Sequence, residues 1–285
     1  MNDHKLLIDA KQLATLLEDS DVRVVDCRFE LMDSDAGRAS YLHEHIPGAV
    51  YADLDNDLAA PVGPATGRHP LPDAAVLADT FGRLGVSNSS HVVVYDDCSG
   101  AVASRAWWLL RWLGHDKVSL LDGGIKHWRA LQLPLESGEI GVAREQFEFM
   151  ARPQLVLETS EIVDAGATCA TLKLVDARDA KRFAGSAEPI DTIAGHIPGA
   201  ISLPLSASLN DDGTWKDQKQ LRQLWDTTLG EGTDGPWSVM CGSGVTACHL
   251  VISGLLAGRP DPRVYVGSWS EWIRDPNREI AVGEA

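Results

Sequence analysis

The sequence predicts an α/β protein built as a tandem duplication, in which each copy is a parallel sheet with helices on both faces. Two observations lead to this prediction. Three landmarks recur in the same order in the two halves of the 285 residues, and in each half short β-branched runs alternate with amphipathic or alanine- and leucine-rich stretches. Alternation of strands and helices is typical of parallel sheets that helices cover.

The landmarks are an Asp-x-Arg after an apolar run, a His-Ile-Pro-Gly-Ala turn and a segment that ends in tryptophan. The matching segments are residues 24–28 with 174–178, 45–50 with 196–201, and 122–128 with 266–272. Three matches in one order indicate a duplication rather than chance.

The apolar runs place the elements. In the first copy we expect strands at 22–25, 92–95 and 118–121 and a helix at 106–113. In the second copy we expect strands at 172–175, 237–240 and 263–266 and a helix at 246–256. Ligands of such sheets bind at the carboxyl ends of the strands, so these ends are where a site is expected.

The chain is long enough for two domains, and its 44% hydrophobic residues suffice for two cores. We expect an N-terminal domain at 1–137 and a C-terminal domain at 154–285. Residues 138–153 lack a sustained apolar period and are interpreted as the linker. Residues 59–70 form a long irregular loop in the first copy, and loops of this length are often functional.

Composition limits the partners. With 25 Lys and Arg against 41 Asp and Glu, the net charge of -16 disfavours nucleic acid and anionic membranes. A small molecule or another protein is therefore expected. No apolar segment reaches the length of a membrane span, and residues 1–5 lack the pattern of an export signal, so we expect a cytoplasmic protein.

The cysteines are odd in number and form no Cys-x-x-Cys pair, which argues against a disulfide framework and against a zinc site. They are Cys27, Cys98, Cys169, Cys241 and Cys248. Free thiols in a reducing compartment fit better.

Cys241 stands where a predicted strand ends and a predicted helix begins. Gly242 and Gly244 flank Ser243, so the backbone can curl and direct several N–H groups at one sulfur. These groups and the positive end of the helix favour a thiolate, which makes Cys241 a candidate nucleophile. The alternative is a buried structural cysteine, and this is how we interpret Cys248, two helical turns further on.

The landmarks, with the loop cysteine in the second copy only, resemble the two-domain rhodanese-like sulfurtransferases over nearly the whole chain. The loop 241–246 (CGSGVT) is similar to that of the 3-mercaptopyruvate sulfurtransferases, whereas thiosulfate sulfurtransferases usually carry basic residues at the positions of Gly242 and Ser243. A cysteine phosphatase is disfavoured because the position of its phosphate-binding arginine is Ala247.

The resemblance implies a reaction without cofactor or metal. Cys241 takes sulfur from 3-mercaptopyruvate as a persulfide, releases pyruvate and passes the sulfur to an acceptor, namely a thioredoxin-like thiol, glutathione or cyanide. A thiosulfate sulfurtransferase and a non-catalytic sulfur carrier are the alternatives. Two domains around one site make a monomer sufficient.

Substrate-binding groups follow from the same resemblance. The N–H groups of the loop would hold the persulfide charge; this set comprises Gly242, Gly244, Val245 and Thr246. Arg182 matches the first carboxylate-binding arginine of the family, and Ile190 stands where the second would fall. This departure implies weaker affinity, another cation in its place, or a different donor.

A proton relay is also implied. Ser243 would deliver a proton to the leaving carbanion, with His69 and Asp55 as its partners. An exposed loop histidine is the competing interpretation of His69, and Asp53 and Asp57 are close alternatives to Asp55.

The first copy is expected to lack a nucleophile. Counting back by the spacing between Trp128 and Trp272 places Asp97 opposite Cys241, with Cys98 one position late and not expected to be catalytic. Residues found in both copies are interpreted as fold-building ion pairs and turn anchors: Asp26, Arg28, His45, Asp176, Arg178 and His196. The tryptophans are interpreted as core and domain-interface residues: Trp107, Trp108, Trp112, Trp128, Trp269 and Trp272.

Overall fold

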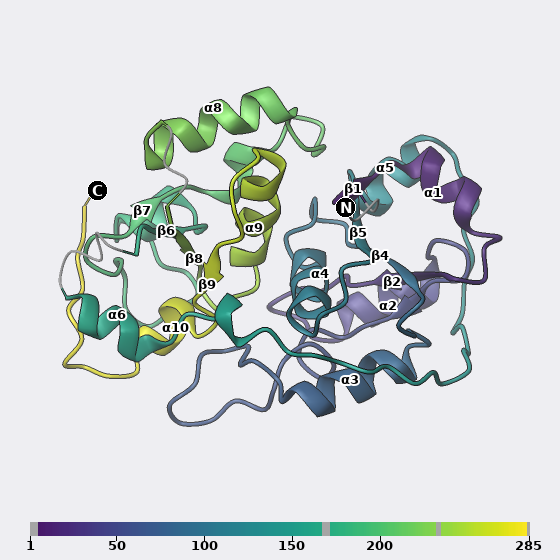
Figure 1. Cartoon of the computed structure of the whole chain (residues 1–285), viewed down its shortest axis with the longest axis horizontal. Coiled ribbons are helices and arrows are strands. Elements are labelled where there is room, and N and C mark those ends of the chain that lie inside the picture. The colour runs from purple at the N-terminus through teal and green to yellow at the C-terminus, as the bar shows by residue number, and fades with distance from the viewer. Residues whose placement is uncertain (1–4, 167–171, 232–234, 284–285) are drawn as a thin grey trace. The chain divides into compact units, whose positions relative to one another are not determined.

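The computed structural model describes residues 5–166, 172–231 and 235–283, and the chain divides into two compact units (Figure 1). The first unit comprises residues 1–60, 72–152 and 211–215, and the second comprises residues 61–71, 153–210 and 216–285. The predicted boundaries, 1–137 and 154–285, do not assign residues 61–71 to the second unit or residues 211–215 to the first. Cys169 and most of the N-terminal segment considered as an export signal lie outside the described residues.

The first unit contains a parallel sheet of five strands in the order β1-β5-β4-β2-β3. The strands are β1 (Leu7–Ile8), β2 (Val22–Asp26), β3 (Val50–Tyr51), β4 (His91–Tyr95) and β5 (Val118–Leu121). Asp26 at the end of β2 pairs with Tyr95 at the end of β4. The loops after these two strands therefore start at the same edge of the sheet.

Helices cover both faces of this sheet. They are α1 (Ala10–Leu16), α2 (Ala36–His43), α3 (Ala74–Arg83), α4 (Ala103–Trp112) and α5 (Gly124–Ala130). Capping side chains fix where two of them begin, because Asp9 accepts from the amide of Gln12 and Asp73 accepts from the amide of Ala75. Leu13 of α1 and Trp128 of α5 pack in one buried cluster with strand residues such as Val93.

The second unit contains a parallel sheet of four strands in the order β7-β6-β8-β9. The strands are β6 (Leu174–Asp176), β7 (Ile201–Ser202), β8 (Ser238–Met240) and β9 (Arg263–Val264). Val156 forms a single parallel bridge with Val264, as β1 pairs with β5 in the first unit. Asp176 pairs with Met240, just as Asp26 pairs with Tyr95.

The helices of the second unit repeat the arrangement of the first. They are α6 (Thr159–Ala165), α7 (Ala180–Phe183), α8 (Gln218–Leu229), α9 (Ala247–Leu256) and α10 (Ser268–Trp272), with 3-10 turns at Pro153–Leu155 and Leu205–Ser208. Figure 1 shows α9 beside the strands of this sheet and α8 above α9. Trp225 of α8 and Trp237 before β8 are both buried, and their rings pack in a tilted arrangement with centroids 4.5 Å apart.

The residues repeated in both copies build the fold. Asp26 and Arg28 form a buried ion pair at 2.6 Å, and Asp176 and Arg178 form its counterpart at 2.8 Å. Each arginine also donates to a backbone carbonyl before the His-Ile-Pro-Gly turn, which anchors that turn to the strand. The six tryptophans named above are all at most 7% exposed.

The predicted α/β architecture with a parallel sheet in each copy is present. The strands and helices that were expected by residue range are found with shifted ends, and the structure adds others, such as β1, β3 and α8. The helix expected at 106–113 begins at Ala103, because the amides at its start donate to the side chain of Asp96. Residues 137–152 contain no helix or strand.

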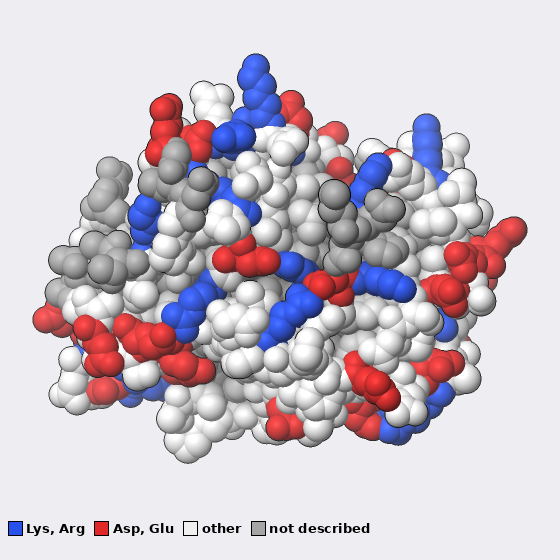
Figure 2. All heavy atoms as spheres, viewed as in Figure 1, with Lys and Arg blue, Asp and Glu red and all other residues white. Residues whose placement is uncertain are grey.

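The surface carries both signs of charge. On the face shown in Figure 2, Lys and Arg side chains are interspersed with Asp and Glu rather than gathered into one patch. Among the described residues, no helix has the length and apolarity that crossing a bilayer requires.

Candidate active site

Cys241 lies immediately after β8, and the loop 242–246 leads from it into α9. The residue is 1% exposed. The amide N–H of Gly244 donates to its Sγ at 3.1 Å, so the chain curls back over the sulfur as predicted for this loop. The start of α9 adds the positive end of a helix to the surroundings of the sulfur.

The tight loop requires glycine at position 244. Gly244 has φ of 78°, and a Cβ there would lie 2.3 Å from the carbonyl oxygen of Val266. A side chain at this position would therefore both strain the backbone and collide with the segment before α10.

Ser268 holds the backbone of Cys241. Its Oγ accepts a hydrogen bond from the amide of Cys241 at 3.0 Å and donates to the carbonyl of Tyr265 at 2.8 Å. Ser268 is fully buried and has φ of 54°, a conformation that costs a non-glycine residue energy. Its position in the first unit is taken by Gly124, with φ of 56°.

His69 and Ser243 meet within the second unit, because residues 61–71 belong to that unit. His69 Nδ1 lies 2.7 Å from Ser243 Oγ, and both side chains are buried. The alternative of an exposed loop histidine is thus wrong. A hydroxyl paired with an imidazole, two residues after Cys241, can move a proton beside the sulfur.

Arg182, in α7, is held by two carboxylates. Its Nε donates to Glu188 at 2.9 and 3.1 Å, and its Nη2 donates to Asp191 Oδ2 at 2.9 Å. Although burial acts to raise the pKa of Glu188, hydrogen bonds from Arg182 and from the amides of Asp191 and Ile190 hold it below its usual range. One of the two partners of Arg182, Glu188, is therefore held in its ionised form.

Arg68 is a candidate site residue that the sequence interpretation missed. Its guanidinium pairs through Nη1 with Asp191 Oδ1, so Asp191 bridges Arg68 and Arg182. Both arginines lie over Gly242, where a Cβ would be 3.0 Å from Arg68 Nη2 and 3.5 Å from Arg182 Nη2. Ile190, in contrast, is an apolar residue that is 40% exposed.

The position that matches Cys241 in the first unit is Asp96, and the predicted match with Asp97 is wrong. Asp96 follows β4 as Cys241 follows β8, and its carbonyl accepts from Ile125 as that of Cys241 accepts from Trp269. The loop after Asp96 is one residue longer, since α4 begins seven positions after Asp96 and α9 begins six after Cys241. Cys98 therefore stands two positions late.

The profile of the "Rhodanese-like domain" family matches this chain twice, at residues 9–131 and at residues 159–275. The first segment contains β2 to β5, and the second contains β6 to β9. The chain belongs to the rhodanese-like family. The resemblance stated from the sequence is thereby confirmed.

Relatives within the rhodanese-like family carry two kinds of name. A protein of Pseudomonas aeruginosa named "Probable 3-mercaptopyruvate sulfurtransferase" is 46% identical over 98% of both chains. A protein of Mycobacterium tuberculosis named "Putative thiosulfate sulfurtransferase SseB" is 38% identical over 99% of this chain and 98% of its own. The crystal structure of SseA from Escherichia coli, described as a 3-mercaptopyruvate sulfotransferase, superposes with a TM-score of 0.82 at 32% identity, covering 93% of this chain and 99% of its own.

Asp55 is the site candidate that the second unit does not contain. It lies in the first unit, in the turn after β3, where its amide donates to Asp53 Oδ1 at 2.9 Å. Burial and the neighbouring Asp53 raise its pKa. Its place in a relay with Ser243 and His69 stays a prediction, as do the roles of Val245 and Thr246, the latter standing directly before α9.

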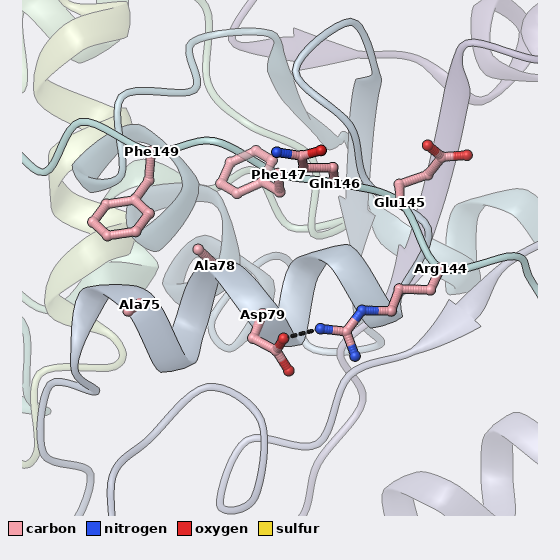
Figure 3. A pocket seen from close by; sticks show the side chains of 8 residues that line it. All are labelled: Ala75, Ala78, Asp79, Arg144, Glu145, Gln146, Phe147 and Phe149. Carbon is pink, nitrogen blue, oxygen red and sulfur yellow. Dashed lines mark hydrogen bonds and ion pairs between the residues drawn. The ribbon is translucent and has the colours of Figure 1, made fainter.

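A cavity of about 430 Å³ lies elsewhere, in the first unit. Figure 3 shows it between α3 and the segment 144–149, with Phe147 and Phe149 above the helix and an ion pair between Asp79 and Arg144. Its lining contains no thiol, hydroxyl or imidazole group, and we assign no chemistry to it. Among the described residues, no group of three or more metal-ligating side chains is present.

Proposed function

We propose that this chain is a 3-mercaptopyruvate sulfurtransferase. The observation that carries the proposal is the set of groups around Cys241: an amide that donates to its sulfur, the Ser243–His69 pair, and two guanidinium groups over Gly242. These groups match a nucleophile, a proton carrier and a carboxylate site. The name of the Pseudomonas aeruginosa relative agrees with this reading.

In the proposed first half-reaction the Cys241 thiolate attacks the sulfur of the donor, and an S–S bond forms while the C–S bond breaks. The electron pair of the C–S bond goes to carbon as the enolate of pyruvate. Ser243 gives that carbon a proton, and the Ser243–His69 pair recovers one from the new persulfide. The thiol proton of the donor thus ends on the methyl carbon of pyruvate, and no outside acid is consumed.

The first unit offers a chemical analogue of the proposed intermediate. The Oδ atoms of Asp96 are one bond beyond Cγ, as the outer sulfur of a persulfide is one bond beyond Sγ. Asp96 Oδ1 accepts from the amides of Cys98 and Gly100, and Oδ2 accepts from those of Val102 and Ala103, at 2.8 to 2.9 Å. A loop of this design therefore suits a terminal anion, which supports a Cys241 persulfide held by the amides of residues 242–246.

The second half-reaction passes the outer sulfur to an acceptor. We propose a thiol, such as that of thioredoxin or glutathione, or cyanide, and a chain that works as a monomer in the cytoplasm. Among the described residues the cysteines are free, which fits a reducing compartment. The net charge of -16 supports a small-molecule donor over a nucleic acid partner.

Thiosulfate is the second candidate donor, because Arg68 and Arg182 bring cations to a loop that has none in its own sequence. Their charges are balanced by Glu188 and Asp191, so a dianion gains less here than at an unpaired cluster. We therefore expect 3-mercaptopyruvate to be preferred.

Steady-state sulfur transfer to a small thiol tests the proposal, with 3-mercaptopyruvate and thiosulfate compared in parallel. A higher kcat/KM for 3-mercaptopyruvate, abolished in Cys241→Ser, is expected. Equal or better turnover of thiosulfate would favour the second candidate, and a parent protein inactive with both donors would favour a sulfur carrier.

A further inference from the structure

Two arginines from distant parts of the chain meet beside the nucleophile. Arg182 comes from α7, and Arg68 comes from the segment 61–71 that is part of the second unit. Both guanidinium groups reach the space that Gly242 leaves by having no side chain. A Cβ built on Gly242 would lie 3.0 Å from Arg68 Nη2 and 3.6 Å from Arg182 Nη1. Gly242 directly follows Cys241, so these nitrogens border the place where a donor must sit.

Arg68 is held in this position from both ends. Its amide donates to Ser270 Oγ at 3.0 Å, and the segment approaches α10 so closely that a Cβ at Gly67 would lie 2.4 Å from the carbonyl oxygen of Gly267. Its Nη1 is paired with Asp191, whose side chain is 3% exposed. The guanidinium is therefore fixed before any ligand arrives, and little conformational entropy remains to be lost on binding.

Donors on the two guanidinium groups remain available. Arg68 Nε is buried and has no hydrogen-bond partner among the described residues. Within the same described part of the chain, Arg68 Nη2 and Arg182 Nη1 are not engaged by Glu188 or Asp191, whose oxygens take the other nitrogens. Buried N–H donors without a partner are costly, and a carboxylate is the acceptor that matches their planar geometry.

We propose that Arg68 binds the carboxylate of the sulfur donor together with Arg182, and that Asp191 positions the two guanidinium groups by giving one oxygen to each. The inference rests on the proposed function and deepens it, because it makes a 2-oxo acid carboxylate the recognised group. Arg68 and His69 are neighbours in sequence, so one short segment supplies both the carboxylate contact and the partner of Ser243.

The experiment compares a donor that has the carboxylate with one that lacks it. The pair is 3-mercaptopyruvate and mercaptoacetone, which carries a methyl group in place of the carboxylate and keeps the reacting thiol and ketone. Arg68→Gln and Arg68→Lys are compared with the parent protein. Arg274→Gln is the matched control, because Arg274 also donates to this segment, at the carbonyl of Thr66, and is exposed.

For Arg68→Gln we expect KM for 3-mercaptopyruvate to rise about tenfold or more with kcat nearly unchanged, since the carboxylate contact is equal in the ground and transition states. KM for mercaptoacetone should not change, which also shows that the variant is folded. KM for 3-mercaptopyruvate in Arg68→Lys should lie between those of the parent and Arg68→Gln, because lysine keeps the positive charge but lacks the planar guanidinium that binds a carboxylate through two hydrogen bonds. Arg274→Gln should match the parent.

Equal losses with both donors in Arg68→Gln would overturn the inference and leave Arg68 as a support for the segment. A variant that matches Arg274→Gln with both donors would also overturn it, while the proposed function would stand because the parent still uses 3-mercaptopyruvate. A parent protein that does not use 3-mercaptopyruvate at all would instead overturn the proposed function and, with it, this inference.

Discussion

Asp96 occupies in the first unit the position that Cys241 occupies in the second. Both follow the strand residue that pairs with the aspartate of an Asp-x-Arg motif. Both carbonyls accept from an amide in the first turn of the helix that contains a repeated tryptophan, α5 or α10. The duplicated fold therefore carries one loop whose amides bind the side chain of Asp96 and one loop that curls over the sulfur of Cys241.

Replacement of Asp96 by asparagine should destabilise the first unit. The carboxylate is fully buried and accepts from four amides, and an asparagine side chain would direct its NH₂ group at some of them. We expect a loss of about 2–4 kcal/mol in the free energy of unfolding. Urea denaturation measures it.

Asp97→Asn is the control for this prediction, because Asp97 is adjacent and only half-buried. It should change the free energy of unfolding by less than about 0.5 kcal/mol. Equal destabilisation by the two variants would show that the four amides do not depend on the Asp96 carboxylate.

Replacement of Ser268 should separate stability from activity. Ser268→Gly relieves a left-handed backbone and removes the acceptor of the Cys241 amide, whereas Ser268→Ala removes the acceptor and keeps the strain. We expect both variants to lower kcat/KM by about tenfold, while the glycine variant is more stable than the alanine variant by about 1 kcal/mol. Sulfur-transfer kinetics and thermal denaturation check the two parts, and full activity in Ser268→Gly would refute the positioning role.

Loss of the Ser243–His69 pair should depend on the donor. The carbon that leaves 3-mercaptopyruvate needs a proton, whereas sulfite leaving from thiosulfate does not. Ser243→Ala and His69→Asn should therefore lower kcat with 3-mercaptopyruvate about 10²-fold or more and affect thiosulfate turnover far less.

The double variant Ser243→Ala/His69→Asn should be little worse than either single one, because two residues that act as a unit have non-additive effects. Parallel kinetics with both donors check this. Equal losses with thiosulfate and 3-mercaptopyruvate would contradict the proton-transfer role.

Cys98 should not react at neutral pH. Burial and the neighbouring carboxylates of Asp96 and Asp97 raise the pKa of its thiol. A raised thiol pKa means that the neutral form persists to higher pH, so little thiolate is present at neutral or mildly alkaline pH. Cys98→Ser should keep the activity of the parent protein across that pH range, and a drop comparable with that of Cys241→Ser would show that Cys98 takes part.

The sequence was sufficient to predict the duplication and to place Cys241 at the end of a strand. Apolar runs of β-branched residues and the repeated Asp-x-Arg motif mark buried strands and their ion pairs, and these patterns survive in both copies. The offset between the copies was a weaker guide. The loop between Asp96 and α4 has one extra residue, so counting back from Cys241 arrived at Asp97 in place of Asp96. The hydrophobic pattern of a sequence does not reveal an insertion inside a loop.

Arg68 shows where pattern reasoning ends. It lies in an irregular loop without apolar period, and it reaches Gly242 through tertiary packing of residues far apart in the chain. Two signals were available: its neighbour His69, and the apolar Ile190 where a second cation was expected. Charge complementarity between Arg68 and Asp191 became visible only when the fold brought them together.

The most direct measurement is the mass of the protein and of its Cys241 peptide after reaction with 3-mercaptopyruvate in the absence of an acceptor, so that only the first half-reaction can occur. The account predicts that the peptide containing Cys241 gains the mass of one sulfur atom, that one pyruvate is released for each sulfur bound, and that a thiol acceptor or cyanide removes the added mass. Pyruvate formation without added sulfur, or sulfur added at another cysteine in place of Cys241, would contradict it.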